Sequence, residues 1–136
     1  MPKLSISERK VRRQNDFNFI VGKLMEQGMA STDLTGGGAC LYRADKIGEC
    51  ERKCAIGWLI PDELYKAEWD RTDQPAEVMK EILGVLGRLE DLTFYRAIQS
   101  ELHDMWASVS DFKKGVKSGA ESIARRYELE LPDAVK

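Results

Sequence analysis

Apolar residues recur at helical spacing in four separate stretches of the chain. In residues 7–27 they fall at Val11, Phe17, Ile20, Val21, Leu24 and Met25. The stretches 75–86, 91–109 and 110–127 show the same period of three to four residues. Residues that favour helix ends flank these stretches. Ser7 is suited to an N-cap, Gly28 to the left-handed conformation that ends a helix, and Pro75 to the first position of a helix. The pattern predicts four main helices.

The inner faces of the last two helices follow from the same spacing. The third is expected to begin at Asp91 or Thr93 and to bury either Met105 or Trp106, together with Val109. Ser110 is placed to cap the fourth.

Two short stretches between the first and second helices predict strands. Residues 39–43 and 51–56 flank a turn-like segment that contains Gly48, and the glycine-rich residues 31–38 before them predict a loop. One hairpin is not stable alone in water, so this one must pack on the helices. The predicted fold is therefore α-rich α+β: four main helices around one short β-hairpin and a short following helix.

Composition places the chain among ordinary globular proteins. Its 136 residues, 43% hydrophobic and 32% charged, predict one domain over 1–136, with loose tails at 1–6 and 131–136. A net charge of −2 gives no global attraction to nucleic acid or anionic membranes, and it is too small for a nucleic-acid mimic. No apolar run is long enough to span a membrane, and the N-terminus lacks the apolar core of a signal peptide. The odd number of cysteines argues against a disulfide scaffold and fits a reducing compartment. We expect a cytoplasmic protein with no membrane association.

The stretch KCAIGWLIPDELY, residues 53–65, has two interpretations. In one, Cys54 is a nucleophile activated at the start of a helical turn, with His103 as base and Asp104 as the group that orients the imidazole. In the other, Cys54 is a small buried residue at the corner where the hairpin leads into the core. The corner also explains Gly57 and Pro61, so we favour it over a thiol enzyme.

A zinc site is a second chemical alternative. Cys40, Cys50 and Cys54 of the hairpin region, with His103 as a fourth ligand, form a thiolate and imidazole set of the kind that zinc binds. The cysteines lack the close C-x₂-C pairs of structural zinc sites, however, and the chain has a single histidine. We therefore expect no cofactor, with zinc as the alternative.

Two charged surfaces are candidates for contact with a partner protein. The first is the acidic segment, residues 62–73, in which Trp69 is either an interface anchor or a lid over the core. Its candidate contact residues are Asp62, Glu63, Tyr65, Glu68, Trp69, Asp70 and Asp73. The second is the basic N-terminal face with Arg9, Arg12 and Arg13, which is either a solvated helix face or a contact for a partner or a phosphate backbone.

Several motifs of the chain resemble those of a family of small, largely uncharacterised phage, prophage and bacterial proteins. The matching stretches are Gln27–Gly28, Gly38-Ala39-Cys40-Leu41-Tyr42-Arg43, Lys53 through Tyr65, Ile98-Gln99, His103-Asp104 and Ala124-Arg125-Arg126-Tyr127. The resemblance extends over most of the chain, from residue 27 to residue 127. The resemblance implies a phage-linked cytoplasmic protein and no particular reaction.

These observations favour an accessory protein that acts by binding a host or phage protein. Inhibition of a host defence system, in the manner of an anti-CRISPR protein, is one specific form of this role. The first alternative is a thiol- or metal-dependent enzyme centred on Cys54 and His103. The second is a nucleic-acid binder that uses the basic N-terminus.

Overall fold

The computed structural model describes residues 4–33 and 40–136, so part of the predicted loop 31–38 lies outside the described residues. Four α-helices and a two-stranded antiparallel hairpin confirm the α-rich α+β fold. The elements, with 3-10 turns labelled η, are α1 (Ile6–Gln27), β1 (Arg43–Ile47), β2 (Cys50–Lys53), η1 (Ile56–Leu59), η2 (Asp62–Leu64), η3 (Ala67–Asp70), α2 (Pro75–Val85), η4 (Leu89–Asp91), α3 (Leu92–Leu102), η5 (Asp104–Trp106), α4 (Phe112–Tyr127) and η6 (Asp133–Val135).

The cap of helix α1 lies two residues before the predicted one. Ser5, not Ser7, caps it: the Ser5 hydroxyl accepts from the Glu8 amide, and the Glu8 carboxylate accepts from the Ser5 amide. This reciprocal pair satisfies two amides that the first turn leaves free. Gly28 ends the helix at φ 68°, as its sequence position predicts. The predicted N-terminal tail is thus fixed at Ser5, and its residues 1–3 lie outside the described part.

The hairpin is confirmed, although its first strand starts at the last residue of the predicted one. Ile47 pairs with Cys50 across a two-residue turn, and Arg43 pairs with Lys53. Gly48 takes a φ of 60° in this turn, which a glycine adopts without strain. The second strand ends at Lys53, so Cys54 belongs to the corner that leads into η1.

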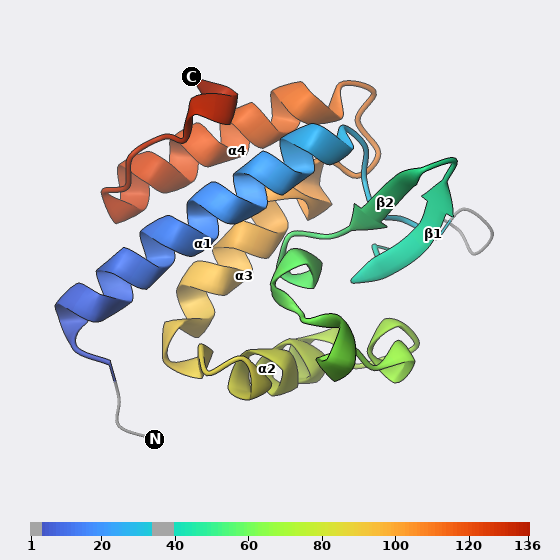
Figure 1. Cartoon of the computed structure of the whole chain (residues 1–136), viewed down its shortest axis with the longest axis horizontal. Helices are drawn as coiled ribbons and strands as arrows, with labels where there is room; N and C mark the ends of the chain where they lie inside the picture. Colours follow the sequence, from blue (N-terminus) through green and yellow to red (C-terminus); the bar gives the residue numbers. More distant parts are fainter. Residues whose placement is uncertain (1–3, 34–39) are drawn as a thin grey trace.

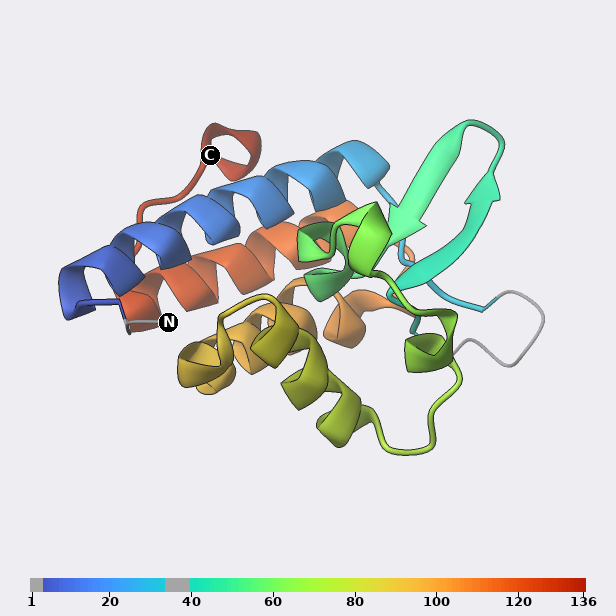
Figure 2. The same ribbon diagram turned by 60° about the horizontal axis from the view of Figure 1, so that its bottom comes forward.

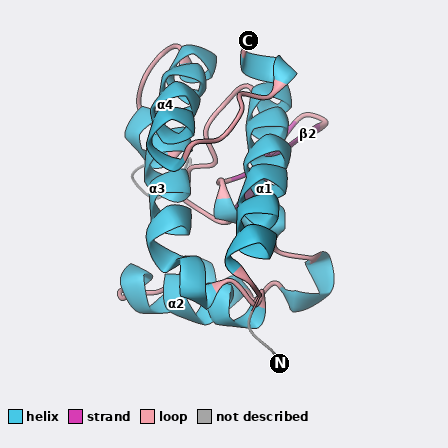
Figure 3. Cartoon of the chain, turned by 90° about the vertical axis from the view of Figure 1, so that its left-hand side faces the viewer, coloured by secondary structure: helices cyan, strands magenta, loops and turns pink. Residues whose placement is uncertain are grey.

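The helices surround the core, and the hairpin projects from them at one end (Figure 1). Helices α1, α3 and α4 run alongside one another (Figures 2 and 3), and α2 lies across the bottom of the molecule in the views of Figures 1 and 3. Their apolar stripes meet in a buried cluster that includes Phe17, Ile20, Ile82, Tyr95, Ile98, Val116 and Ile123. The Pro75 start of α2 is confirmed.

The junction between α3 and α4 differs from the prediction. Helix α3 ends at Leu102, so Met105 and Val109 are exposed at 55% and 44%, while Trp106 covers the start of α4. Asp111, not Ser110, caps α4 by accepting from the Lys114 amide. After His103 the chain forms the 3-10 turn η5 in place of a further α-helical turn, so the apolar period overestimates the length of α3.

The prediction of a loose C-terminal tail is wrong. After α4, Leu131 packs against the core and Val135 is only 2% exposed. Gln14 of α1 holds the segment by exchanging two hydrogen bonds with the main chain of Glu130. Two apolar residues in a short polar stretch do not form a periodic pattern, so the sequence gives no sign of this contact.

Candidate functional site

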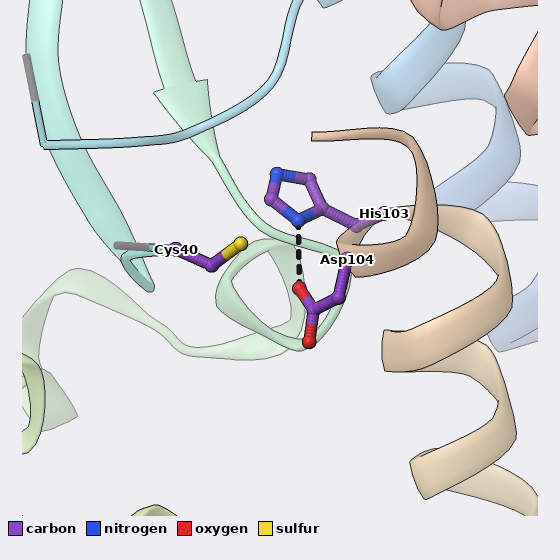
Figure 4. Close-up of side chains that lie close together, drawn as sticks. All are labelled: Cys40, His103 and Asp104. Carbon is purple, nitrogen blue, oxygen red and sulfur yellow. Dashed lines mark hydrogen bonds and ion pairs between the residues drawn. The ribbon is translucent and has the colours of Figure 1, made fainter. Parts of the chain in front are cut away.

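A cavity of about 360 Å³ lies between the start of β1, the segment η3 and helices α2 and α3. The polar residues of its lining are Cys40, Tyr42, Cys54, Asp70, Thr72, Gln99 and Asp104. Five sequence candidates therefore line the same cavity: Cys40, Cys54, Trp69, Asp70 and Asp104. Cys40, His103 and Asp104 meet at its α3 side (Figure 4).

His103 is completely buried, and both of its ring nitrogens are in use. The Ser31 amide donates to Nε2 at 2.9 Å, so this nitrogen carries a lone pair and no proton. The proton of the neutral ring is then on Nδ1, which donates to the Asp104 carboxylate at 2.9 Å. Neither nitrogen remains free to accept a proton from a nucleophile or to bind a metal ion.

The end of α3 orients this group through two side chains one helical turn apart. Gln99 and His103 lie at positions i and i+4, which share one face of a helix. The Gln99 amide donates to Asp104 at 2.8 Å, and its carbonyl oxygen accepts from the Ile56 amide of η1 at 2.9 Å. The hairpin-to-core corner and the end of α3 are thus connected through Gln99.

The two thiols of the cavity are held in their protonated form. Cys40 is an exposed residue, but partial desolvation of its thiol, and then the charge of Asp104, raise its pKa to about 12. Burial also raises the pKa of Cys54 well above its usual value, and hydrogen bonds from Gly57 and Gln99 offset only part of this effect. A thiolate nucleophile needs the opposite shift. The geometry therefore does not favour a Cys54–His103–Asp104 enzyme.

The ligand set predicted for zinc is not assembled. Among the described residues, the potential ligands that lie together are Cys40, His103 and Asp104, whose ligand atoms are within 4.8 Å of one another. Cys50 lies by the end of α1, where its thiol contacts the Gln27 carbonyl at 3.6 Å. Because both nitrogens of His103 are already bonded, the residues at the cavity do not fit a zinc ion in this arrangement.

The acidic segment contains structural as well as surface residues. Of the two interpretations of Trp69, the lid over the core fits the structure and the exposed anchor does not, because the residue is 3% exposed and its indole donates to Glu81 at 2.7 Å. Asp70 accepts from the Tyr42 and Arg43 amides and from the Tyr65 hydroxyl, so it fixes the start of β1. The other acidic candidates are exposed: Asp62, Glu63, Glu68 and Asp73.

The N-terminal arginines are not a free basic surface. Arg9, Arg12 and Arg13 all reach the buried carboxylate of Asp91 at the start of α3, with Arg9 at 2.6 Å. Burial of Asp91 opposes its ionisation, but the hydrogen bonds and charges of Arg9 and Arg13 outweigh it and lower the pKa to about 2. The three arginines of the basic pattern are thus engaged in ion pairs inside the fold, which does not favour phosphate binding there.

No protein-family model matches the chain, and no curated protein or solved structure matches it. In the described residues, no helix has the length and apolar character needed to cross a membrane.

Sequence reasoning missed three residues that shape this region. Ser31, Gln99 and Asp91 act through partners 43 to 82 positions away, beyond the reach of any periodic pattern. Gln99 alone had a local signal, because it precedes His103 by one helical turn.

Proposed function

We propose that this chain is a phage-linked accessory protein that acts by binding a host or phage protein. The motif resemblance supports the phage link. That link in turn supports a more specific role, in which the partner belongs to a host defence system. The acidic segment is the proposed contact surface. One observation carries the proposal: three exposed carboxylates of this segment, those of Glu63, Glu68 and Asp73, form no ion pair with any residue that the structure describes.

The charge of the acidic segment is concentrated and largely uncompensated. Residues 62–73 contain five acidic and two basic residues, a net charge of −3 in a chain of net charge −2. Among the described residues, Glu63, Glu68 and Asp73 form no ion pair, whereas Asp62 pairs with Arg43. Free carboxylates on short helical turns attract a basic partner surface and accelerate its association.

The two alternatives receive less support from the same structure. Catalysis by Cys54 needs a lowered thiol pKa and a free base, but burial raises that pKa and His103 is bonded at both nitrogens. Nucleic-acid binding by the N-terminus needs free cations, but Arg9, Arg12 and Arg13 converge on Asp91.

Affinity capture from host lysate, with identification by mass spectrometry, tests the proposal. The tagged chain is compared with the triple variant Glu63→Gln, Glu68→Gln, Asp73→Asn. A matched control, Asp45→Asn, Glu49→Gln, Glu51→Gln, removes the same number of exposed carboxylates from the hairpin. We expect the control to retain a stoichiometric partner and the first variant to bind it at least about tenfold more weakly.

Equal capture by both variants would exclude the acidic segment as the contact. Failure of the unmodified chain to capture any stoichiometric protein would contradict the protein-binding function itself. Capture should also weaken as salt is added, because exposed charges are screened.

A further inference from the structure

The cavity beside Cys40 contains two carboxylates, and no described residue offers either of them a cationic partner. The donors to Asp70 in the described part of the chain are neutral: the Tyr42 and Arg43 amides and the Tyr65 hydroxyl. Asp104 accepts from Gln99 and from the neutral ring of His103. Within the described residues, neither carboxylate forms an ion pair with a lysine or arginine. The cavity therefore has a net negative charge.

Three neutral groups of the cavity wall respond to this charge. Burial raises the pKa of the Cys40 and Cys54 thiols and of the Tyr42 hydroxyl, and Asp104 raises each of them further. Asp70 adds to the effect at Tyr42 and Cys54. The part of these pKa shifts that comes from Asp104 and Asp70 indicates a negative potential, which disfavours a further negative charge and attracts a cation.

The cavity has a free hydrogen-bond acceptor, so it fits a ligand that donates a hydrogen bond. Both nitrogen donors that reach Asp104 from the described residues end at Oδ1, and the second oxygen points away from His103 (Figure 4). The Asp104 side chain is 41% exposed, so a ligand can approach this oxygen. The site thus offers one accessible acceptor, supported by the fixed charge of Asp70.

The rest of the lining is apolar. Leu41, Trp69, Pro75 and Met79 contribute to the walls, and the volume of about 360 Å³ lies at the small end of the range for ligand sites. Aliphatic stems of long cationic side chains pack on such surfaces while the charged end reaches a polar group. The shape and lining fit a cation on an apolar stem.

A metal ion fits the same space less well. Inner-sphere binding requires several free lone pairs, but the oxygens of Asp70 already accept three hydrogen bonds, and His103 has none to offer. A hydrogen-bonding cation needs only the accessible oxygen of Asp104 and the surrounding negative potential.

We propose that this cavity binds the cationic end of an arginine or lysine side chain, with Asp104 as its acceptor and Asp70 as a fixed negative charge. The inference rests on the proposed protein-binding function, since the partner would present that side chain. The cavity is distinct from the exposed carboxylates of the acidic segment, and it adds a specific pocket to their general attraction.

Titration of the ¹⁵N-labelled chain with N-acetyl-argininamide and N-acetyl-lysinamide tests the pocket without a partner. The neutral isostere N-acetyl-citrullinamide is the control ligand. We expect the cationic probes to shift the amide signals of Leu41, Tyr42, Gln99 and Asp104, and the neutral probe to have no such effect. Because no partner is involved, the outcome is independent of the lysate capture.

Asp104→Asn removes the charge and keeps an oxygen for Gln99 and His103. It should weaken binding of the cationic probes at least about fivefold with an unchanged melting temperature, whereas Asp45→Asn in the hairpin should have no effect. In the unmodified chain, raising the salt from about 20 mM to about 300 mM should weaken binding. Salt-independent binding, equal binding of the citrulline probe, or no cavity shifts at all would overturn the proposal.

Discussion

Gly57 is a residue at which the fold has no room for a side chain. A Cβ atom there would lie 2.2 Å from the Tyr42 carbonyl oxygen, closer than atoms approach in proteins. The contact presses η1 against the chain just before β1, and so places Cys54 and Tyr42 on the same cavity wall. The geometry of the candidate site thus depends on one missing methyl group.

Gly57→Ala should therefore destabilise the protein. The methyl group forces backbone apart, and we expect the free energy of unfolding to fall by about 2–3 kcal/mol in urea denaturation. Gly22→Ala is the matched control, since nothing lies within 4 Å of a Cβ at that position inside α1. The control should raise stability by about 0.5–1 kcal/mol. An equal response of the two variants would contradict the close approach at Gly57.

At the scale of elements, charged side chains tie α1 to the region where α2 leads into α3. Three arginines of α1 share the buried Asp91 carboxylate. A second tie lies nearby, where Arg88 donates to both oxygens of Asp16 and the Tyr95 hydroxyl donates to the same carboxylate. These ties fix the angle between helices that are far apart in the sequence.

Asp91→Asn should lower the free energy of unfolding by roughly 3 kcal/mol, because it leaves converging cations without their counter-ion. Glu90→Gln, which removes only the partly exposed partner of Arg12, should cost less than about 1 kcal/mol. The pKa of Asp91 in the fold, about 2, is below the usual 3.8. Its stabilisation is therefore complete above about pH 4 and is lost as the pH falls towards 2.

Chemical denaturation at several acidic pH values measures this loss. Asp91→Asn should show a flatter dependence of stability on pH between about 4 and 2 than the unmodified chain. Parallel pH profiles for the two proteins would show that the carboxylate is not held by the arginines.

At the scale of the whole molecule, the chain returns to its first helix at the C-terminus. Helix α4 ends at Glu128 in a left-handed conformation, φ 56°, which turns the chain back over α1. Leu129 and Val135 then enter the core, and η6 contacts α1. The two ends of the described chain thereby stabilise each other.

Removal of residues 132–136 should lower the free energy of unfolding by about 2 kcal/mol, the value of burying one valine side chain. Lys136→Ala changes only an exposed residue and should be neutral within about 0.5 kcal/mol. Thermal and urea denaturation of the three proteins provide the comparison. A truncated chain as stable as the complete one would mean that Val135 contributes nothing to the core.

The sequence predicts what depends on neighbouring residues and misses what depends on distant ones. The helical periods, the Pro75 start and the Gly28 ending follow from local rules, and the structure confirms them. Arg9 and Asp91 are 82 positions apart, and Ser31 and His103 are 72 apart. No local pattern indicates such pairs, so the arginines look like a free surface and His103 like a free base.

Because three arginines share one carboxylate, substitutions at the arginines and at Asp91 should not be tolerated equally. Each arginine has two others beside it, so loss of one leaves the remaining pair in place and is tolerated. No second carboxylate can take the place of Asp91, so a substitution of Asp91 is not tolerated. A collection of functional variants should therefore contain replacements at Arg9, Arg12 or Arg13 singly, rarely in combination, and almost none at Asp91.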